Sequence, residues 1–356
     1  MTNSKRYSIA LIPGDGIGAE VLDAALVPLR VVAARHGFEL AEQAYDWSSE
    51  RHLRTGAMMP ENGVDLLRRH DAILLGAVGW PDLVPDDVTL HGLLLPIRKE
   101  LDLFANVRPH RVLPGITGPL RKDGFDILCV RENTEGEYSG AGGRVHRGRA
   151  DEVAVETAVF TRQAVERILR YAFDQARERT GRLASVTKSN AQRHTMVFWD
   201  EVTDEVAQEY PDVEVRRYHV DAIAARMITH PETLDVVVAS NLFGDILSDI
   251  GAAIQGGLGF AASANINPSR DVPSMFEPVH GSAPDIAGQG IANPVATVWS
   301  ASLMLRHLGE HAAATELFAA MEIVSQDGHG LTPDCGGSES THGVADRIAD
   351  VVAGGP

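Results

Sequence analysis

The sequence predicts an α/β fold built on a mixed, largely parallel sheet. Short apolar runs alternate with longer amphipathic stretches along most of the chain, which is the pattern of strands and of the helices that cover them. The segment 71–79, DAILLGAVG, is apolar throughout, as parallel strands covered on both faces are. A chain of 356 residues is long enough for one large or two medium domains, and we expect two.

Each predicted strand is an apolar or β-branched run between turn-forming residues. In chain order, the strand-bearing segments are 6–12, 38–45, 71–79, 125–130, 183–190, 213–227 and 235–240. The alternating run 151–161, DEVAVETAVFT, could be an exposed hairpin or arm. The predicted helices are 16–37, part of 90–107, 162–181, 245–255, 293–309 and 312–326.

Composition excludes several classes of protein. The net charge of −17, from 32 basic and 49 acidic residues, argues against a surface for nucleic acid or anionic lipid. Cys129 and Cys335 are too distant for a zinc motif or a disulfide framework, and Cys129 lies in an apolar run typical of a core thiol. The first residues show no apolar signal region and no run approaches a membrane span, so we expect a cytoplasmic protein.

The segment VVVASNLFGDILSD carries the strongest chemical signal. It predicts a buried strand, a glycine turn and then a helix from Asp245. Asp245 and Asp249 would share one helix face, where like charges repel unless a cation lies between them. Hard divalent cations such as Mg²⁺ or Mn²⁺ take oxygen ligands of this kind. The alternative is a solvated acidic face, or Asp245 as an N-cap.

Three arginines lie at or near the ends of predicted elements: Arg98, Arg108 and Arg131. If they converge, they can hold two carboxylates by bidentate contacts, whereas each alone could be a surface arginine. The polar run 131–140 follows a core strand, where α/β enzymes place chemistry, and its Tyr138 is a candidate general acid.

Two further charged residues follow predicted strands. Lys188 lies just past one strand and could relay protons beside a metal, although most lysines are surface residues. Asp221 begins a helix, either as an N-cap or as a third carboxylate for the cation.

Glycine-rich segments point to close approach of a ligand to the backbone. PGDGIG at 13–18 follows the first strand, but its G-x-G-x-G spacing is not the Rossmann fingerprint G-x-G-x-x-G. It indicates a tight turn before a helix N-terminus that can face a ligand. The segment 279–294 has small residues and few large apolar ones, which suits a functional loop over a flat ligand.

Seven motifs occur in order along nearly the whole chain: PGDGIG, IRKEL, NVRP, VRENTEGEYSG, TKSN, NLFGDILSD and FEPVHGSAPDIAGQGIANP. Together they resemble the β-decarboxylating dehydrogenases, a family that includes isocitrate, isopropylmalate, homoisocitrate and tartrate/D-malate dehydrogenases. The segments GAVGWPDLVPD, RILRYAF and SANINPSR look most like the tartrate/D-malate branch.

The resemblance implies an isopropylmalate dehydrogenase-like two-domain fold rather than a Rossmann fold. The first domain, 1–103 with 256–356, would carry the NAD side. The second domain, 104–255, would carry the substrate and metal side, the interface of a homodimer and a β arm. In such relatives Lys188 and Asp221 would reach into the neighbour's site, so each active site would be shared.

The resemblance also implies residue roles in NAD-dependent oxidative decarboxylation. Arg98, Arg108 and Arg131 would hold substrate carboxylates, and Tyr138, Lys188 and Asp221 would move protons. Asp221, Asp245 and Asp249 would hold Mg²⁺ or Mn²⁺. The cofactor residues would be His280, Gly281, Ser282, Ala283, Asp285, Ile286 and Asn293. Relatives that use NADP carry lysine and tyrosine at positions 285 and 286, and an aspartate would repel a 2′-phosphate, so NAD is expected.

The predicted substrate is a small-molecule 2-hydroxy dicarboxylate, D-malate or tartrate. Isopropylmalate enzymes carry glutamate at the position of His91, with leucines that match Leu94 and Leu95. The missing acid disfavours 3-isopropylmalate without excluding it. Isocitrate is disfavoured because leucine at 94 would leave a third carboxylate desolvated and unpaired. An alternative of another class is a metal-dependent lyase without redox chemistry.

Overall fold

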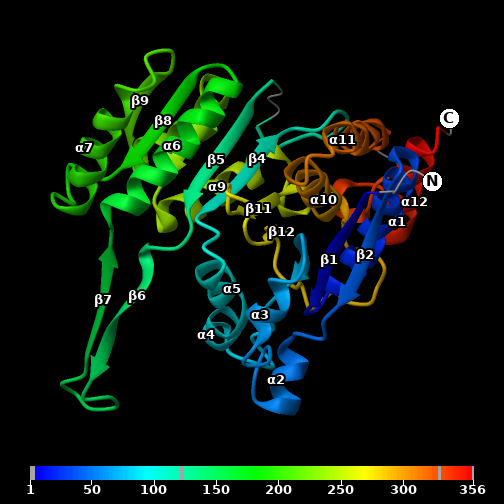
Figure 1. Cartoon of the computed structure of the whole chain (residues 1–356), viewed down its shortest axis with the longest axis horizontal. Coiled ribbons are helices and arrows are strands. Elements are labelled where there is room, and N and C mark those ends of the chain that lie inside the picture. Colours follow the sequence, from blue (N-terminus) through cyan, green and yellow to red (C-terminus); the bar gives the residue numbers. More distant parts are fainter. Residues whose placement is uncertain (1–4, 121–123, 328–329, 355–356) are drawn as a thin grey trace. The chain divides into compact units, whose positions relative to one another are not determined.

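Two chain units, each with its own set of paired strands, make up the structure in Figure 1. The computed structural model describes residues 5–120, 124–327 and 330–354. Unit 1 comprises Met1–Leu103, Val112–Lys122 and Ala252–Pro356, and unit 2 comprises Phe104–Arg111 and Asp123–Gly251. The predicted α/β fold with a mixed, largely parallel sheet is confirmed. The domain division expected at 103/104 and 255/256 assigns 112–122 and 252–255 differently from these units, and it stays a prediction.

Unit 1 pairs strands from both ends of the chain in the order β2-β1-β3-β12-β11. Their bounds are β1 Lys5–Gly14, β2 Phe38–Ala44, β3 Ala72–Ala77, β11 Ala262–Ile266 and β12 Ser274–Pro278. The pairs β1/β2, β1/β3 and β12/β3 are parallel, and β11 is antiparallel to β12. The carboxyl ends of β1, β3 and β12 therefore lie at one edge of the sheet, where the chain continues into Gly14, Gly79 and the loop after Pro278.

Helices cover both faces of the unit 1 strands. The bounds are α1 Gly18–His36, α2 Ser49–Thr55, α3 Gly63–Leu67, α4 Asp86–Thr89, α5 Leu95–Glu100, α10 Val295–His307, α11 His311–Gln326 and α12 Thr341–Val352. One strand face contributes Ala10, Ile12 and Ile73 to a core cluster with Leu67 of α3 and Ile97 of α5. This period of two is the one that a strand between two helical layers requires. Helix α12 was not predicted.

A π-helical turn, Leu90–Leu94, precedes α5 and allows the helical segment to contain Pro96. Proline has no backbone N–H, so the carbonyl four residues before it cannot receive the ordinary helical hydrogen bond. The chain widens instead, and the Leu95 N–H bonds to the Leu90 carbonyl five residues back. Helix α5 follows directly, with Pro96 in its first turn.

Unit 2 pairs its strands in the order β4-β5-β10-β8-β9. Their bounds are β4 Ala105–Arg111, β5 Asp126–Glu132, β8 Arg182–Thr187, β9 Glu214–His219 and β10 Val236–Ala239. Strands β5, β10, β8 and β9 are parallel, and β4 is antiparallel to β5. The helices are α6 Arg162–Glu178, α7 Thr195–Ala207, α8 Val220–Thr229 and α9 Asn241–Gln255. Helix α7 packs on the sheet through Met196 and Trp199, which are buried, and Trp199 Nε1 donates to Ser185 Oγ of β8 at 3.2 Å.

The alternating run at 151–161 forms one strand of a hairpin, as predicted. Strands β6 Gly136–Val145 and β7 Val153–Val159 pair antiparallel, and in Figure 1 the ribbon extends away from the helices and strands of its own unit. Val145, Val153 and Val155 are exposed on it. An exposed two-stranded ribbon with apolar side chains is marginal in water on its own, so this arm favours a partner surface.

The predicted glycine turn before Asp245 is wrong, because α9 begins at Asn241 and runs through Gly244. The side chain of Glu137 receives the Ser240 hydroxyl at 2.9 Å and the Leu242 N–H at 3.1 Å, which satisfies the helix N-terminus directly after β10. A Cβ at Gly244 would lie 2.6 Å from Cβ of Arg131. The glycine therefore permits close helix–strand packing rather than a turn.

His110 is a fully buried histidine on β4 that sequence analysis did not identify. Its ring lies against Gly251 of α9, where an added Cβ would be 2.6 Å away, and neither ring nitrogen has a hydrogen-bond partner among the described residues. Burial, assisted by the charge of Arg108, lowers the pKa of His110 to about 3. Among the described residues, no helix has both the length and the apolar character that crossing a bilayer requires.

A buried ion pair between Asp235 and Arg179 holds the chain just before β10. The Asp235 carboxylate is 2% exposed and accepts from Arg179 Nε at 2.6 Å and from the Thr180 N–H at 3.0 Å. Asp235→Ala leaves Arg179 without its buried partner, and we expect it to lower the free energy of unfolding by about 3–5 kcal/mol. Asp126→Ala is the matched control, since Asp126 pairs with the same arginine but is 51% exposed, and its loss should cost about 1 kcal/mol or less. Chemical denaturation of both variants measures this, and equal losses would contradict the assignment.

His110 predicts a pH dependence of stability. The unfolded histidine binds a proton below its ordinary pKa of 6.5, whereas the folded one does so only below about 3. Between those values the unfolded state holds one more proton, so the free energy of unfolding falls as pH falls, by up to about 1.4 kcal/mol per pH unit. His110→Leu should remove that part of the slope between pH 6 and pH 4.5.

The control for this experiment is His230→Leu, which replaces an exposed histidine of the same unit. Denaturation at a series of pH values should give the wild-type slope for His230→Leu. A wild-type slope for His110→Leu would show that His110 gains a proton in the folded state and would contradict the prediction.

Candidate active site

Helix α9 presents Asp245 and Asp249 to two buried arginines of unit 2. Arg131 at the end of β5 donates from Nη1 to Asp245 Oδ1. Arg108 Nη1, on the neighbouring strand β4, lies 3.4 Å from the same Asp245 oxygen and 3.9 Å from Asp249 Oδ1. The structure therefore brings four of the predicted site residues into one cluster. Arg98 lies in unit 1.

The two arginines are fixed by neutral partners as well as by the aspartates. Arg131 donates from Nε and Nη2 to Asn241 Oδ1, at 2.9 and 2.6 Å. Arg108 donates to Asn106 Oδ1 at 2.8 Å and to Ser248 Oγ at 2.7 Å. Buried guanidinium groups need such partners, because a desolvated charge without them is costly. Sequence analysis missed Asn106, Asn241 and Ser248. Asn241 could have been identified, because it is a polar residue directly after a predicted core strand, as Lys188 is.

Tyr138 of β6 joins the same cluster. Its hydroxyl donates to Asp245 Oδ2 at 3.1 Å, and the Arg131 guanidinium lies 5.4 Å from the centre of its ring. Burial and the adjacent Asp245 charge raise the pKa of Tyr138. The phenol thus keeps its proton at neutral pH and can act as a donor.

The glutamates of the run RENTEGEY stabilise turns and helix ends instead of providing chemistry. Glu132 accepts the N–H groups of Thr134 and Glu135, at 3.1 and 2.8 Å. Glu135 accepts the Thr161 N–H at 2.8 Å, just before α6, and Glu137 meets the start of α9. Acceptors at helix N-termini satisfy otherwise unpaired N–H groups. The polar density that suggested catalysis therefore has largely a positioning role.

The two aspartates of α9 have the electrostatics of a cation site. Asp249 is 65% exposed in its side chain. Burial of its inner part and the charge of Asp245 raise the pKa of Asp249, against the opposing effect of Arg108 and Arg131. A further positive charge at this face would relieve the remaining repulsion, and carboxylate oxygens are the ligands that Mg²⁺ and Mn²⁺ prefer. The donor set fits such a cation.

Lys188 and Asp221 form a separate pair at the ends of β8 and β9. Lys188 Nζ donates to Asp221 Oδ1, and this hydrogen bond lowers the pKa of Asp221. Within the described parts of the chain, three or more His, Cys, Asp or Glu side chains nowhere gather in a group that could hold a metal. Asp221 therefore does not join Asp245 and Asp249 within one chain.

The substrate residues predicted in unit 1 lie on or beside α5. Arg98 is buried and donates from Nη2 to Glu277 Oε1 at 2.7 Å, while its Nε has no partner among the described residues. Glu277 Oε1 also accepts Asn265 Nδ2 at 2.8 Å. Leu94 belongs to the core cluster and is only 9% exposed, whereas Leu95 is half-buried and His91 is exposed on the π-helical turn.

The loop 279–294 is anchored to the PGDGIG turn of unit 1. Ser282 O accepts the Ile17 N–H at 2.8 Å, and a Cβ at Gly16 would lie 2.0 Å from that same oxygen. Asp15 is buried and receives the Ser49 N–H at 2.7 Å and the Gly79 N–H at 2.9 Å. These contacts join the PGDGIG turn to three other chain segments at the carboxyl edge of the unit 1 strands.

The predicted cofactor residues differ in how far they are already engaged. Asn293 donates to Asp334 Oδ2 at 3.1 Å and accepts the Val295 N–H at 3.0 Å, so it holds the loop's end. Gly281 has open space where a Cβ would stand, and Asp285 is exposed. The His280 Nε2 atom is enclosed without a hydrogen-bond partner among the described residues. An unpartnered nitrogen beside an open glycine fits a loop that receives a ligand. Ala283, with φ of 37°, and Ile286 pack towards α1 through Ile17 and Val21.

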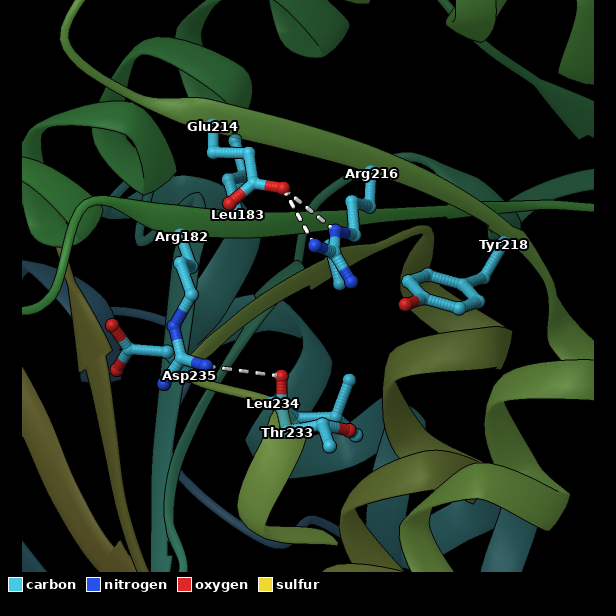
Figure 2. Close-up of a pocket in the computed structure, with 9 residues that line it drawn as sticks. Arg182, Leu183, Glu214, Arg216, Tyr218, Thr233, Leu234 and Asp235 are labelled. Carbon is cyan, nitrogen blue, oxygen red and sulfur yellow. Dashed lines mark hydrogen bonds and ion pairs between the residues drawn. The ribbon is translucent and has the colours of Figure 1, made fainter. Parts of the chain in front are cut away.

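A small pocket in unit 2 lies away from this chemistry. Figure 2 shows it at the amino ends of β8, β9 and β10, where Glu214 pairs with Arg216 and Arg182 Nη1 donates to the Thr233 carbonyl at 3.5 Å. Its volume of about 20 Å³ has room for about one water molecule. It is too small to hold a substrate.

Comparison with known proteins identifies a family and its fold. The sequence profile of the family "Isocitrate/isopropylmalate dehydrogenase" matches residues 8–350. A probable tartrate dehydrogenase/decarboxylase of Agrobacterium vitis is 54% identical over 355 residues, covering 98% of this chain and 97% of the relative. The D-malate dehydrogenase (decarboxylating) of Escherichia coli strain K12 is 48% identical over 358 residues, covering 98% and 99%. The solved isocitrate dehydrogenase from Methylococcus capsulatus aligns with a TM-score of 0.87 and 36% identity, over 97% and 99% of the two chains.

Proposed function

The chain belongs to the isocitrate/isopropylmalate dehydrogenase family and is an oxidoreductase, and we propose that it catalyses NAD-dependent oxidative decarboxylation of D-malate, tartrate or both. The observation that carries the proposal is the cluster of Arg108 and Arg131 with Asp245 and Asp249. Buried guanidinium groups bind small carboxylates, and the paired aspartates suit a divalent cation. The similarity of the whole chain to tartrate and D-malate dehydrogenases supports this substrate class.

The cation would be held by Asp245 and Asp249 of one chain, with Asp221 as a third ligand. When bound, Mg²⁺ or Mn²⁺ would acidify the substrate's 2-hydroxyl group and neutralise negative charge that develops on that oxygen. Because Asp221 lies apart from the other two within a chain, we propose that it comes from a second copy in a homodimer. The exposed valines of the β6–β7 arm support such an assembly.

The protein's own groups then bind, orient and move protons. Arg98, Arg108 and Arg131 hold the substrate carboxylates, so the bond to the departing carboxylate keeps one orientation. Lys188 with Asp221 removes the hydroxyl proton, and the lowered pKa of Asp221 keeps that carboxylate charged. Hydride leaves C2, the β-carboxylate leaves as CO₂, and Tyr138, with its raised pKa, returns a proton to carbon.

The hydride acceptor would be NAD, bound along the loop 279–294 of unit 1. NAD supplies the nicotinamide carbon that accepts the hydride. His280 Nε2 has no hydrogen-bond partner among the described residues, so it is available to NAD. Gly281 leaves room for NAD to approach the backbone closely. Asp285, exposed on this loop, favours the ribose hydroxyls of NAD over the 2′-phosphate of NADP, since like charges repel.

Formation of NADH tests the proposal. The assay takes D-malate, the tartrate stereoisomers and 3-isopropylmalate, with Mn²⁺ or with EDTA, and with NADP in parallel. We expect metal-dependent turnover with NAD that is highest on D-malate or a tartrate. Lys188→Ala and Asp245→Asn should each lower kcat/KM by at least about a hundredfold, because each removes a group that acts on the reacting atoms.

The matched control is Lys5→Ala, since Lys5 also pairs with a single carboxylate, Glu310, but is 62% exposed and lies at the amino end of β1, the opposite end from the PGDGIG turn. It should retain wild-type activity. Highest turnover on 3-isopropylmalate would overturn the substrate assignment, and turnover unaffected by EDTA would overturn the cation. Absence of NADH with every substrate would overturn the proposed function.

A further inference from the structure

A second polar cleft lies in unit 1, at the opposite edge of the sheet from the loop 279–294. It opens at the amino ends of β3 and β12 and has a volume of about 370 Å³. The charged and imidazole side chains that line it are Arg68, Arg69, His70, Asp71, Arg270, Asp271 and His307. Because β3 and β12 are parallel, this edge cannot be the one that carries His280 and Gly281. The proposed reaction therefore leaves the cleft without a role.

Two of the three arginines of the cleft, Arg69 and Arg270, differ from most others in this acidic chain. Elsewhere, exposed arginines such as Arg162 and Arg177 pair with glutamate or aspartate at 2.6 Å. Arg69 and Arg270 are exposed, and in the described parts of the chain neither forms an ion pair. Two guanidinium groups left without carboxylates, in a protein of net charge −17, make a local positive field that small anions can find.

The other residues that line the cleft do not occupy the guanidinium groups of Arg69 and Arg270. Arg68 donates to the Glu100 carbonyl at 2.6 Å and stands 3.8 Å from Asp65. His70 is bonded through both ring nitrogens, to Ser8 at 2.9 Å and to Tyr45 at 2.8 Å, and the Asp71 carboxylate receives the Ser8 N–H at 2.7 Å. Asp71 and Asp271 are both exposed carboxylates of the cleft, and Asp271 is the one next to Arg270 in sequence.

His307 adds a neutral donor to the cleft wall. Its ring lies 5.6 Å from that of Phe276, and burial together with the charge of Arg270 lowers the pKa of His307 to about 4. At neutral pH it is an uncharged imidazole whose N–H can donate to an oxyanion.

We propose that this cleft binds a small molecule through a phosphate group, with Arg69 and Arg270 as the principal contacts. A guanidinium group presents two parallel N–H donors that match two oxygens of a phosphate, and a multiply charged oxyanion gains most from two such groups. The cleft volume of about 370 Å³ leaves room for a ligand larger than one phosphate. A carboxylate shares part of this chemistry, and the experiment separates the two.

Titration calorimetry with pyrophosphate, inorganic phosphate and citrate tests the site, at constant ionic strength and with EDTA present. Arg69→Gln/Arg270→Gln should weaken pyrophosphate binding at least about tenfold, since two charge-assisted contacts are lost. Asp271→Asn should tighten it, because a repelling charge is removed. Wild-type stability of each variant, measured by thermal unfolding, shows that the fold is intact.

Two controls separate the cleft from other anion sites. Arg54→Gln/Arg306→Gln removes the same charge from exposed positions of unit 1 that do not line the cleft, and it should bind pyrophosphate within about twofold of wild type. Arg108→Gln, in the proposed active site, should leave this binding intact. Wild-type binding by Arg69→Gln/Arg270→Gln, equal losses in both double variants, weaker binding by Asp271→Asn, or binding of citrate but not pyrophosphate would each overturn the proposal.

Discussion

The contact of the Asp245 carboxylate with Arg131 and Arg108 is the interaction on which the rest of unit 2 depends. It joins the first turns of α9 to β4 and β5, so it fixes both the helix and the two arginines. Neighbouring residues support this contact. Gly244 allows the helix to approach Arg131, and Asn241 accepts a hydrogen bond from the same guanidinium group. Glu137 satisfies the helix start. A buried cluster of this kind must be complete, because a single missing partner leaves a desolvated charge.

The charged site residues of unit 2 form two separate groups. Asp245, Asp249 and their arginines lie on α9, β4 and β5, while Lys188 and Asp221 pair with each other at the ends of β8 and β9. Neither group alone holds all the residues proposed for the cation and for the proton relay. The proposal of a site shared by two chains rests on this separation, and the exposed valines of the β6–β7 arm support it.

Sequence patterns predicted the parts of the fold that depend on local periodicity. The strand at 71–79 and the helix at 162–181 were identified because apolar spacing alone defines them, and both are present. The start of α9 was misplaced because glycine usually marks a turn, whereas Gly244 is set by the distance to Arg131, a residue more than a hundred positions away. Helix α12 was not predicted, although its buried Val344, Ile348 and Val352 recur at the helical spacing.

The candidate site was predictable residue by residue but not in its connections. Arg108, Arg131, Tyr138, Asp245 and Asp249 were identified, and the structure places them together. The partners that fix them, such as Asn241 and Ser248, come from tertiary packing that no spacing rule reveals. The glutamates at 132, 135 and 137 show the converse, since a dense polar motif beside a core strand serves mainly to satisfy turns and helix ends.

A mixed-subunit assay tests the central claim, that each active site combines residues of two chains. Lys188→Ala and Asp245→Asn are purified separately, each inactive, then unfolded, mixed in equal amounts and refolded together. In a hybrid dimer one site receives an intact Asp245 from one chain and an intact Lys188 from the other. Random pairing then predicts recovery of about a quarter of the activity of wild-type protein refolded alongside. A mixture that stays as inactive as its parents, while the wild type recovers and the hybrid is shown to form, would mean that the site lies within one chain and would contradict the account.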